Sequence, residues 1–218
     1  MTKIAISGGS GYTGCELLRL LSAHPGAKVT AVTSEKSAGK SVTALFPHLH
    51  KYSNLTYQPL DKESLLDKAE VFFMALPHAA SQEAVDFFVR KGKLVIDLSA
   101  DYRLRDPLLY EEWYKTPHEY KATLRKAVYG LPEVYRNKIK GSKLIANPGC
   151  YPTGALLGLY PLFKARLVEM SFPIIIDSKS GASGAGRQSD VAFSFCEVNG
   201  GFRAYGLTTH RHTPEMEQ

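Results

Sequence analysis

The feature that most constrains the fold of this chain is a cluster of glycines directly behind a short apolar run at its N-terminus. Residues 3–7, Lys-Ile-Ala-Ile-Ser, have the composition of a β-strand, and residues 8–14, Gly-Gly-Ser-Gly-Tyr-Thr-Gly, follow at once. The leucine-rich run 15–22 then has the pattern of a helix. A strand, a G-x-G-x-x-G turn and a helix in this order are typical of dinucleotide binding, because glycine lets backbone N–H groups approach a pyrophosphate.

Strands and helices continue to alternate further along the chain. We predict strands at 29–33, 71–75, 94–98 and 143–146, and a helix at 81–90. The strands are almost continuously apolar, which indicates a sheet buried on both faces. This alternation predicts an α/β fold, a doubly wound parallel sheet of the Rossmann type, in a first domain that spans residues 1–149.

A second domain is expected over residues 150–218. It opens with a helical pattern at 151–163, continues with an isoleucine-rich strand at 172–178, and then has a Gly/Ser-rich loop at 180–187. The remainder of the sequence is less regular. We therefore predict a smaller α+β unit behind the dinucleotide-binding domain.

The C-terminal residues carry the signal of a helix start. Thr213 suits an N-cap, Pro214 the first helical position and Glu215 the first turn, yet the sequence stops at Gln218. Because so short a helix is not stable alone, we expect the second domain to be incomplete. A frayed, capped tail is the alternative.

Composition excludes several classes of function. The formal net charge of +6 suits an anionic ligand but serves solubility equally well, and no dense Lys/Arg run with interleaved aromatic residues indicates a nucleic-acid partner. The three cysteines are widely spaced, which argues against disulfides and against metal-binding pairs. Without an apolar run of membrane-spanning or signal-peptide length, we expect a cytoplasmic protein with no membrane partner.

The glycine loop and the end of the second strand form the predicted cofactor site. Its loop residues are Gly8, Ser10, Gly11, Tyr12, Thr13 and Gly14. The second strand ends in Thr33-Ser34-Glu35-Lys36, where Ser34 and Lys36 are suited to a 2′-phosphate, whereas Glu35 argues for NAD. We favour NADP, and ordinary solvated charges are the alternative for the lysine.

The stretch 147–153, Asn-Pro-Gly-Cys-Tyr-Pro-Thr, carries the chemistry. It places Cys150 at the first turn of a predicted helix, where N–H groups without intrahelical partners favour a thiolate and offer donors to an oxyanion. We interpret Cys150 as a nucleophile, and Cys15 and Cys196 as structural residues.

A nucleophilic cysteine in redox chemistry needs an acid/base. His210 and His212 stand together near Glu215, and the sequence leaves open which histidine faces the thiol. No cysteine or aspartate stands at ligand spacing from them, so we predict no metal.

Two further segments are suited to anions. Arg103 follows the strand at 94–98 and can hold a phosphate or carboxylate, with a local ion pair to Asp101 as the alternative. Arg187 closes the donor-rich loop at 180–187, which suits an anion or the nicotinamide end of a cofactor, with a plain linker as the alternative.

These motifs together resemble the N-acetyl-γ-glutamyl-phosphate reductase family. The stretches that carry the resemblance lie in family order at 8–14, 97–103, 129–133, 147–153, 180–187 and 210–215. The resemblance implies a Rossmann domain followed by a catalytic domain like that of glyceraldehyde-3-phosphate dehydrogenase, here incomplete, because family members continue well past residue 215.

The resemblance also implies an activity and the residues that serve it. The expected reaction is NADPH-dependent reductive dephosphorylation of N-acetyl-γ-glutamyl phosphate, in arginine biosynthesis, through a thioester on Cys150. One of His210 and His212 acts as the acid/base, and the enzyme is a homodimer or homotetramer. Further cofactor contacts are expected from Leu76, Pro77, Ser180 and Gly181, and substrate contacts from Arg103, Ser183, Arg187 and Glu215.

Three rival hypotheses remain open at this point. The first is a related reductase: aspartate-semialdehyde dehydrogenase, which the residues around Cys150 disfavour, or an enzyme for a carrier-bound acyl phosphate. The second is a module that senses NADP without catalysis. The third is a non-functional fragment, suggested only by where the chain stops.

Overall fold

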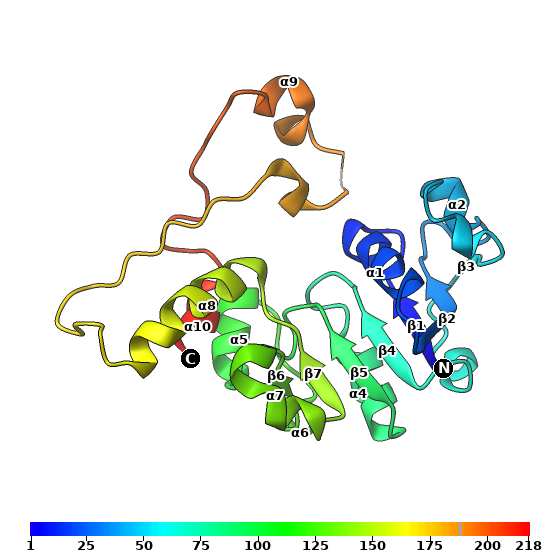
Figure 1. Ribbon diagram of the computed structural model, residues 1–218, viewed down its shortest axis with the longest axis horizontal. Helices are drawn as coiled ribbons and strands as arrows, with labels where there is room; N and C mark the ends of the chain where they lie inside the picture. Colours follow the sequence, from blue (N-terminus) through cyan, green and yellow to red (C-terminus); the bar gives the residue numbers. More distant parts are fainter. Residues whose placement is uncertain (188) are drawn as a thin grey trace. The chain divides into compact units, whose positions relative to one another are not determined.

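The predicted parallel sheet is present, with seven strands, in the computed structural model of the chain (Figure 1). The model describes residues 1–187 and 189–218, which divide into one compact unit of residues 1–147 and another of residues 148–218. The strands are β1 (Thr2–Ser7), β2 (Ala27–Thr33), β3 (Tyr57–Gln58), β4 (Val71–Met74), β5 (Leu94–Asp97), β6 (Val128–Tyr129) and β7 (Leu144–Ala146). Every neighbouring pair is parallel, which confirms the doubly wound α/β class.

Both faces of the sheet are buried, as the apolar strands predict. On β1, Ile4 and Ile6 pack with Leu18 of α1 (Tyr12–Ser22) in one core cluster. Ala5 faces the opposite way, into a second cluster with Phe88 of α4 (Gln82–Arg90). The period-two alternation of a strand therefore divides the apolar residues of β1 between two helical layers.

The remaining helices of the first unit are short and lie in the connections between its strands. They are α2 (Val42–Leu45), η1 (His50–Tyr52), α3 (Lys62–Leu66), α5 (Pro107–Tyr114), α6 (Lys121–Leu124) and α7 (Pro132–Lys140). The start of α5 follows from its sequence: the Asp106 side chain accepts a hydrogen bond from the Leu108 N–H, and Pro107 occupies the first turn.

The strand order β3-β2-β1-β4-β5-β7-β6 sets where a ligand can bind. The chain runs outward from β1 through β2 to β3, then returns to the other side of β1 and continues through β4 and β5. Ligands of open α/β sheets bind at the carboxyl ends of the strands where this direction reverses. The loops after β1, β4 and β5 therefore form the candidate crevice of the first unit.

The second unit is mostly irregular. It contains α8 (Cys150–Lys164), η2 (Ala182–Ala185), η3 (Val191–Phe193), α9 (Phe195–Val198) and α10 (Thr213–Glu217). The last helix starts at Thr213, one residue before the predicted first helical position at Pro214, so its N-cap is His212 rather than Thr213. In Figure 1, α10 lies beside α8, although the short helices η2, η3 and α9 separate the two in the sequence.

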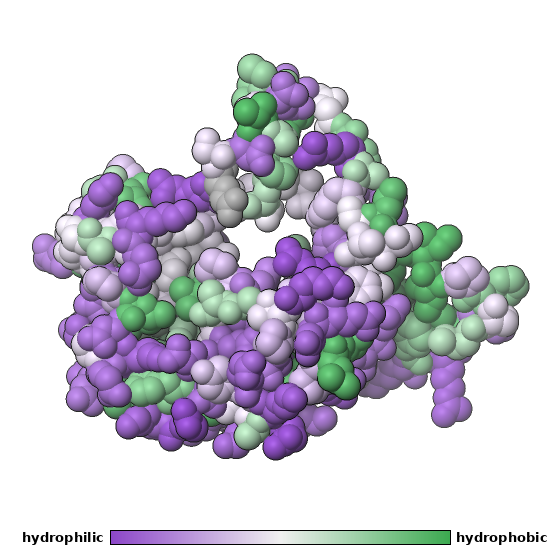
Figure 2. Space-filling view, turned by 180° about the vertical axis from the view of Figure 1, so that it is seen from behind, coloured by the Kyte–Doolittle hydropathy of each residue, from purple (hydrophilic) through white to green (hydrophobic). Residues whose placement is uncertain are grey.

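The strand predicted at 172–178 is wrong, because residues 173–180 have no regular structure. A strand needs a hydrogen-bonded neighbour, and no described segment pairs with this one. Its side chains are correspondingly exposed, with Phe172 at 72% and Ile175 at 87%. Figure 2 shows hydrophobic surface gathered on the segment that follows α8, at the right of the view.

Among the described residues, none of the helices combines the length and the apolar character that crossing a membrane requires.

Candidate functional site

The glycine loop is shaped for a close backbone approach. Gly8 has φ +83°, and a Cβ there would lie 2.1 Å from the carbonyl oxygen of Ala75. A Cβ on Gly14 would lie 2.5 Å from the Cα of Gly9. At Gly11, by contrast, a Cβ would meet only the carbonyl oxygen of Gly8, at 3.7 Å. The loop is thus packed against the protein on one side and open at Gly11, next to the first turn of α1, which fits a pyrophosphate.

The end of β2 lies beside this loop. The hydroxyl oxygens of Ser10 and Ser34 are 2.7 Å apart, so the predicted phosphate-binding serine is joined directly to the glycine loop. Lys36 is exposed. Glu35, the residue that argues for NAD, accepts a hydrogen bond from the Leu60 N–H at 2.8 Å. Its carboxylate therefore has a backbone partner at the end of β3.

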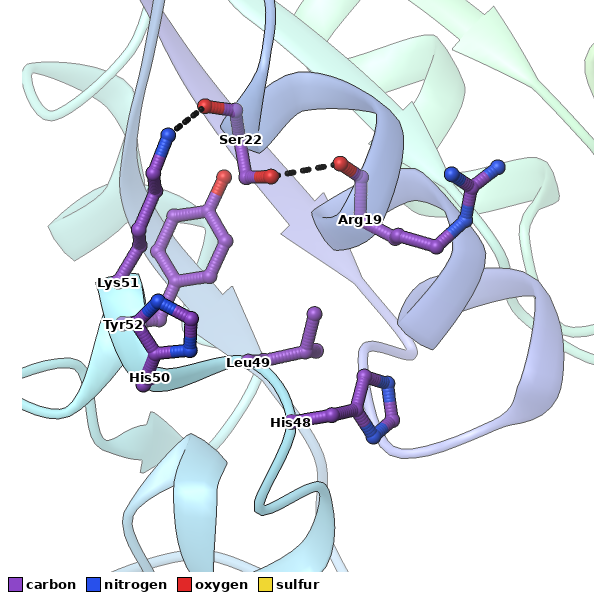
Figure 3. Close-up of a pocket in the computed structure, with 7 residues that line it drawn as sticks. All are labelled: Arg19, Ser22, His48, Leu49, His50, Lys51 and Tyr52. Carbon is purple, nitrogen blue, oxygen red and sulfur yellow. Dashed lines mark hydrogen bonds between the residues drawn. The ribbon is translucent and has the colours of Figure 1, made fainter.

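A separate hollow of about 110 Å³ lies between α1 and η1 (Figure 3). It is lined by Arg19, Ser22, His48, Leu49, His50, Lys51 and Tyr52. Lys51 donates to the carbonyl oxygen of Ser22 at 3.0 Å, and the Ser22 hydroxyl donates to that of Arg19 at 2.7 Å. These bonds cap the last carbonyls of α1, at the opposite end of the helix from the glycine loop, so the hollow is separate from the candidate cofactor site.

Arg103 is buried, with 6% of its surface exposed. Its Nε donates to the carbonyl oxygen of Asn147 at 2.8 Å, and its Nη2 donates to that of Leu98 at 2.9 Å. The guanidinium thus joins the backbone after β5 to the backbone after β7. Its predicted contact with substrate stays a prediction, whereas its role in fixing these two strand ends is visible in the structure.

Cys150 is the first residue of α8 and is exposed, while Gly149 provides the extended N-cap. The Thr153 hydroxyl donates to the Gly149 carbonyl oxygen at 2.8 Å, which holds the turn against the helix. The Pro-Gly-Cys-Tyr-Pro-Thr sequence therefore forms the local geometry that it predicts, a thiol at the N-terminal end of a helix.

Glu215 reaches the cysteine turn from the far end of the second unit. It is 3% exposed, and its Oε1 accepts a hydrogen bond from the Gly149 N–H at 2.7 Å. The sequence predicts a substrate contact for Glu215. The structure instead shows its carboxylate on the residue before the cysteine, and the substrate contact stays a prediction.

Both candidate histidines lie around the same turn. A Cβ on Gly149 would lie 2.4 Å from Nε2 of His212, so this ring nitrogen is held directly over the backbone next to Cys150. Nδ1 of His210 accepts a hydrogen bond from the His212 N–H at 3.1 Å, and the centroids of the two imidazole rings are 4.8 Å apart. Burial, and then the charge of Arg211, lowers the pKa of His210.

Two tyrosines that sequence reasoning did not single out complete this cluster. The hydroxyl oxygens of Tyr151 and Tyr205 are 2.5 Å apart, and the centroids of the Tyr205 and His210 rings are 5.5 Å apart. Burial and the hydrogen bond with Tyr151 raise the pKa of Tyr205 to about 12. No sequence signal pairs two tyrosines this far apart; only the position of Tyr151 beside the cysteine pointed to the site.

The Gly/Ser-rich loop is exposed throughout. The Ser180 hydroxyl donates to the Gly181 carbonyl oxygen at 3.0 Å, and the Gly184 N–H donates to the same carbonyl oxygen at 3.0 Å. The cofactor contacts predicted for Ser180 and Gly181 and the substrate contacts predicted for Ser183 and Arg187 stay predictions, as do those of Leu76 and Pro77 after β4.

Within residues 1–187 and 189–218, no three His, Cys, Asp or Glu side chains lie together in a way that would hold a metal ion.

Sequence comparison with known families agrees with this architecture. The family model for the semialdehyde dehydrogenase NAD-binding domain matches residues 3–142, and that for the semialdehyde dehydrogenase dimerisation domain matches residues 150–218. The chain belongs to the semialdehyde dehydrogenase family.

Two curated relatives of this chain share one name. The chain is 55% identical to a protein of Geobacter sulfurreducens and 53% identical to one of Geobacter metallireducens, both named N-acetyl-gamma-glutamyl-phosphate reductase. Each match covers 100% of this chain and 63% of the relative, so the chain spans less than two thirds of their length.

Solved structures support the fold. An aspartate semialdehyde dehydrogenase with NADP from Candida albicans superposes with a TM-score of 0.56 at 21% identity, over 76% of this chain and 47% of that one. Aspartate semialdehyde dehydrogenase II from Vibrio cholerae gives a TM-score of 0.53 at 19% identity, over the same shares of the two chains. At these identities the likeness concerns the fold alone.

Proposed function

We propose that this chain carries the cofactor and nucleophile sites of an NADPH-dependent reductase that converts N-acetyl-γ-glutamyl phosphate to its semialdehyde. The observation that carries the proposal is the cluster around Cys150: an exposed thiol at the start of α8, with Glu215 and His212 held against the residue before it. The names of the relatives that are 53–55% identical supply the substrate.

Residues 1–149 form the cofactor domain in this proposal, with the glycine loop on the pyrophosphate. Ser34, joined to Ser10, and the exposed Lys36 are suited to a 2′-phosphate, and the engaged carboxylate of Glu35 removes the main argument for NAD. NADP is therefore the proposed cofactor, and when bound it supplies the hydride.

Residues 150–218 form the catalytic domain. The Cys150 thiolate attacks the acyl carbon, and the bond from that carbon to the phosphate oxygen breaks. Inorganic phosphate departs, and the acyl group remains bound to the sulfur as a thioester. The N–H groups of residues 150 and 151 stand at the helix end, where no intrahelical acceptor exists, and stabilise the oxyanion. Glu215 fixes the Gly149 peptide and so orients this end of the helix.

His212 is the proposed acid/base. Its Nε2 lies over Gly149, whereas His210 accepts the His212 backbone N–H and so orients it. As the thioester carbon is reduced, the His212 imidazolium donates a proton to the carbonyl oxygen and forms a hemithioacetal. The imidazole takes the same proton back when the carbon–sulfur bond breaks, which releases the aldehyde and restores the thiolate.

The proposed assembly is a homodimer or homotetramer. Its support is the match of residues 150–218 to a dimerisation domain and the large apolar side chains exposed there, such as Phe172, Ile175 and Phe202.

The test is oxidation of NADPH by N-acetyl-γ-glutamyl phosphate. It compares this chain with a chimaera that adds the part of the Geobacter sulfurreducens relative which this chain does not match. The expected result is turnover in the chimaera that disappears with Cys150→Ala and persists with Cys196→Ser, a matched change at another exposed cysteine. Preference for aspartyl phosphate, or turnover with NADH alone, would contradict the proposed substrate or cofactor.

A further inference from the structure

We propose that Asp101 is a positioning residue, which holds the loop of residues 76–81 in the conformation that receives the dinucleotide. The inference rests on the proposed cofactor site of the first unit and adds a residue to it from a different strand. Nothing in the glycine motif indicates Asp101, which lies after β5, two strands away from β1.

The carboxylate of Asp101 is fully buried and accepts four hydrogen bonds. Oδ1 accepts from the Ala79 N–H at 2.7 Å and from the Tyr110 hydroxyl at 2.8 Å. Oδ2 accepts from both the N–H and the hydroxyl of Ser81, at 3.0 and 2.8 Å. Three of these four donors belong to the loop after β4, so one side chain organises that loop.

The loop needs this support because part of its backbone is strained. Ala79 has φ +67°, in the left-handed region that costs a residue with a Cβ free energy. Pro77, His78, Ala79 and Ala80 are exposed, so the packing of their side chains does not hold them in place. The hydrogen bond from the Ala79 N–H to Asp101 offsets the strain at that residue.

A second contact joins the two loops in the opposite direction. Nδ1 of His78 accepts a hydrogen bond from the Ala100 N–H at 3.0 Å. Asp101 therefore binds the loop after β4, and His78 binds the loop after β5. Together they fix two neighbouring strand ends of the crevice to one another.

The held loop begins directly against the glycine loop. The Ala75 N–H donates to the carbonyl oxygen of Ser7 at 2.8 Å, and the Ala75 carbonyl oxygen occupies the space that a Cβ on Gly8 would need. A change in the path of residues 76–81 therefore alters the wall of the proposed dinucleotide site.

The network requires an acceptor at position 101. Both of its oxygens face donors, so an asparagine would direct its own NH2 at an N–H or hydroxyl group and lose at least one bond. Asp97, in the same network, differs: its Oδ2 lies 2.8 Å from the Ser99 hydroxyl, which in turn lies 2.6 Å from the Ser81 hydroxyl.

The two carboxyl groups have different partners. Asp97 accepts from the N–H and the hydroxyl of Ser99, at 3.1 and 2.8 Å, whereas Asp101 accepts from Ala79 and Ser81 of the loop itself. Burial raises the pKa of Asp97 to about 7, so this carboxyl group carries a proton below that pH. Asparagine at position 97 can still accept from the Ser99 N–H and donate to the Ser99 hydroxyl, whereas asparagine at position 101 would turn its NH2 group toward a donor.

The experiment measures NADP affinity by fluorescence titration and hydrogen exchange of residues 76–81 in this chain. Asp101→Asn is expected to raise the NADP Kd about tenfold or more, the equivalent of one lost charge-assisted hydrogen bond, and to speed exchange in the loop. Asp97→Asn should keep both near wild type. Asp106→Asn is the matched control, because Asp106 is an exposed N-cap where asparagine serves equally well.

A second-site variant separates positioning from a general loss of structure. Ala79→Gly removes the cost of the left-handed conformation, so in the Asp101→Asn background it should recover part of the lost affinity. If Asp101→Asn unfolds the chain, Ser81→Ala replaces it, since it removes the hydroxyl bond to Oδ2 while Asp101 remains, and Ala79→Gly is then tested in that background.

The outcomes are distinct from those of the proposed function. Wild-type affinity and unchanged loop exchange in Asp101→Asn would overturn the inference, as would weaker binding that Ala79→Gly does not restore. If the wild-type chain binds no dinucleotide, the proposed function fails, while loop exchange still decides whether Asp101 holds residues 76–81.

Discussion

The two candidate sites of this chain are built in different ways. In the first unit, the loops around the glycine motif follow adjacent parallel strands, so the sheet brings them together and Asp101 joins two of them. In the second unit, the cysteine turn depends on one buried carboxylate, Glu215, from a five-residue helix at the far end of the unit. The first site is supported by a core, whereas the second depends on a few long-range contacts, and we expect them to fail independently.

Cys150→Ser gives the largest expected effect. Hydroxyl is a much weaker nucleophile than thiolate at neutral pH, so turnover of the chimaera should fall by about a thousandfold or more. NADP affinity should not change, because the glycine loop belongs to the first unit. The measurements are steady-state NADPH oxidation and fluorescence titration; a parallel loss of cofactor binding would show that the sites are not independent.

Gly14→Ala should disturb the cofactor site of the first unit and leave the cysteine site unchanged. The new Cβ would lie 2.5 Å from the Cα of Gly9, and overpacking of this kind costs about 1–3 kcal/mol. We expect NADP affinity to fall while the rate of Cys150 alkylation by iodoacetamide stays the same. Gly11→Ala is the control, since the Cβ there meets only the Gly8 carbonyl oxygen at 3.7 Å.

Glu215→Ala should disturb the second site alone. It removes the carboxylate that accepts from the Gly149 N–H, a loss worth about 1.5–3 kcal/mol for a bond to a charged group. Cys150 alkylation and turnover should both change by about tenfold or more. Glu215→Gln retains an acceptor oxygen, so its alkylation rate and turnover should lie between those of the wild type and Glu215→Ala. Equal effects of both variants would assign the role to the charge alone.

Asp97→Asn gives the smallest expected effect, on the pH dependence of stability. Burial raises the folded-state pKa of Asp97 to about 7, Asp101 contributes to the rise, and Ser99 and Arg103 oppose it. Because the folded pKa is raised, the stability from this group is fully present at low pH and is lost as the pH rises towards 7. Between pH 5 and 8 the melting temperature of the wild type should therefore fall by a few degrees more than that of Asp97→Asn; parallel curves would contradict the protonated Asp97.

The parts of the fold that the sequence predicts are those set by local pattern. The apolar runs behind β1, β2, β4, β5 and β7 identify the sheet, because period and burial are visible in each segment alone. The two-residue strands β3 and β6 are too short to give a pattern, and they form only because a neighbouring strand offers an edge. The predicted strand at 172–178 fails for the converse reason, since its pattern is strong but no described segment pairs with it.

The same division applies to the candidate site. Cys150 at a helix start follows from the turn residues around it. The contact of Glu215 with Gly149, the pairing of Tyr151 with Tyr205, and the hydrogen bonds of Asp101 with residues 79 and 81 depend on tertiary structure that no spacing encodes. For Arg103, the ligand contact suggested by its position after β5 stays a prediction, whereas its hydrogen bonds to two backbone carbonyl groups become visible only in the fold.

Trapping the proposed thioester on Cys150 tests the mechanism directly. The chimaera is mixed with N-acetyl-γ-glutamyl phosphate in the absence of NADPH, quenched in acid and digested, and the cysteine peptides are analysed by mass spectrometry. We expect one N-acetylglutamyl group on the Cys150 peptide, released by hydroxylamine and converted to free aldehyde when NADPH is added before the quench. An unmodified Cys150 in a chimaera that turns over the same substrate with NADPH would contradict the thioester mechanism.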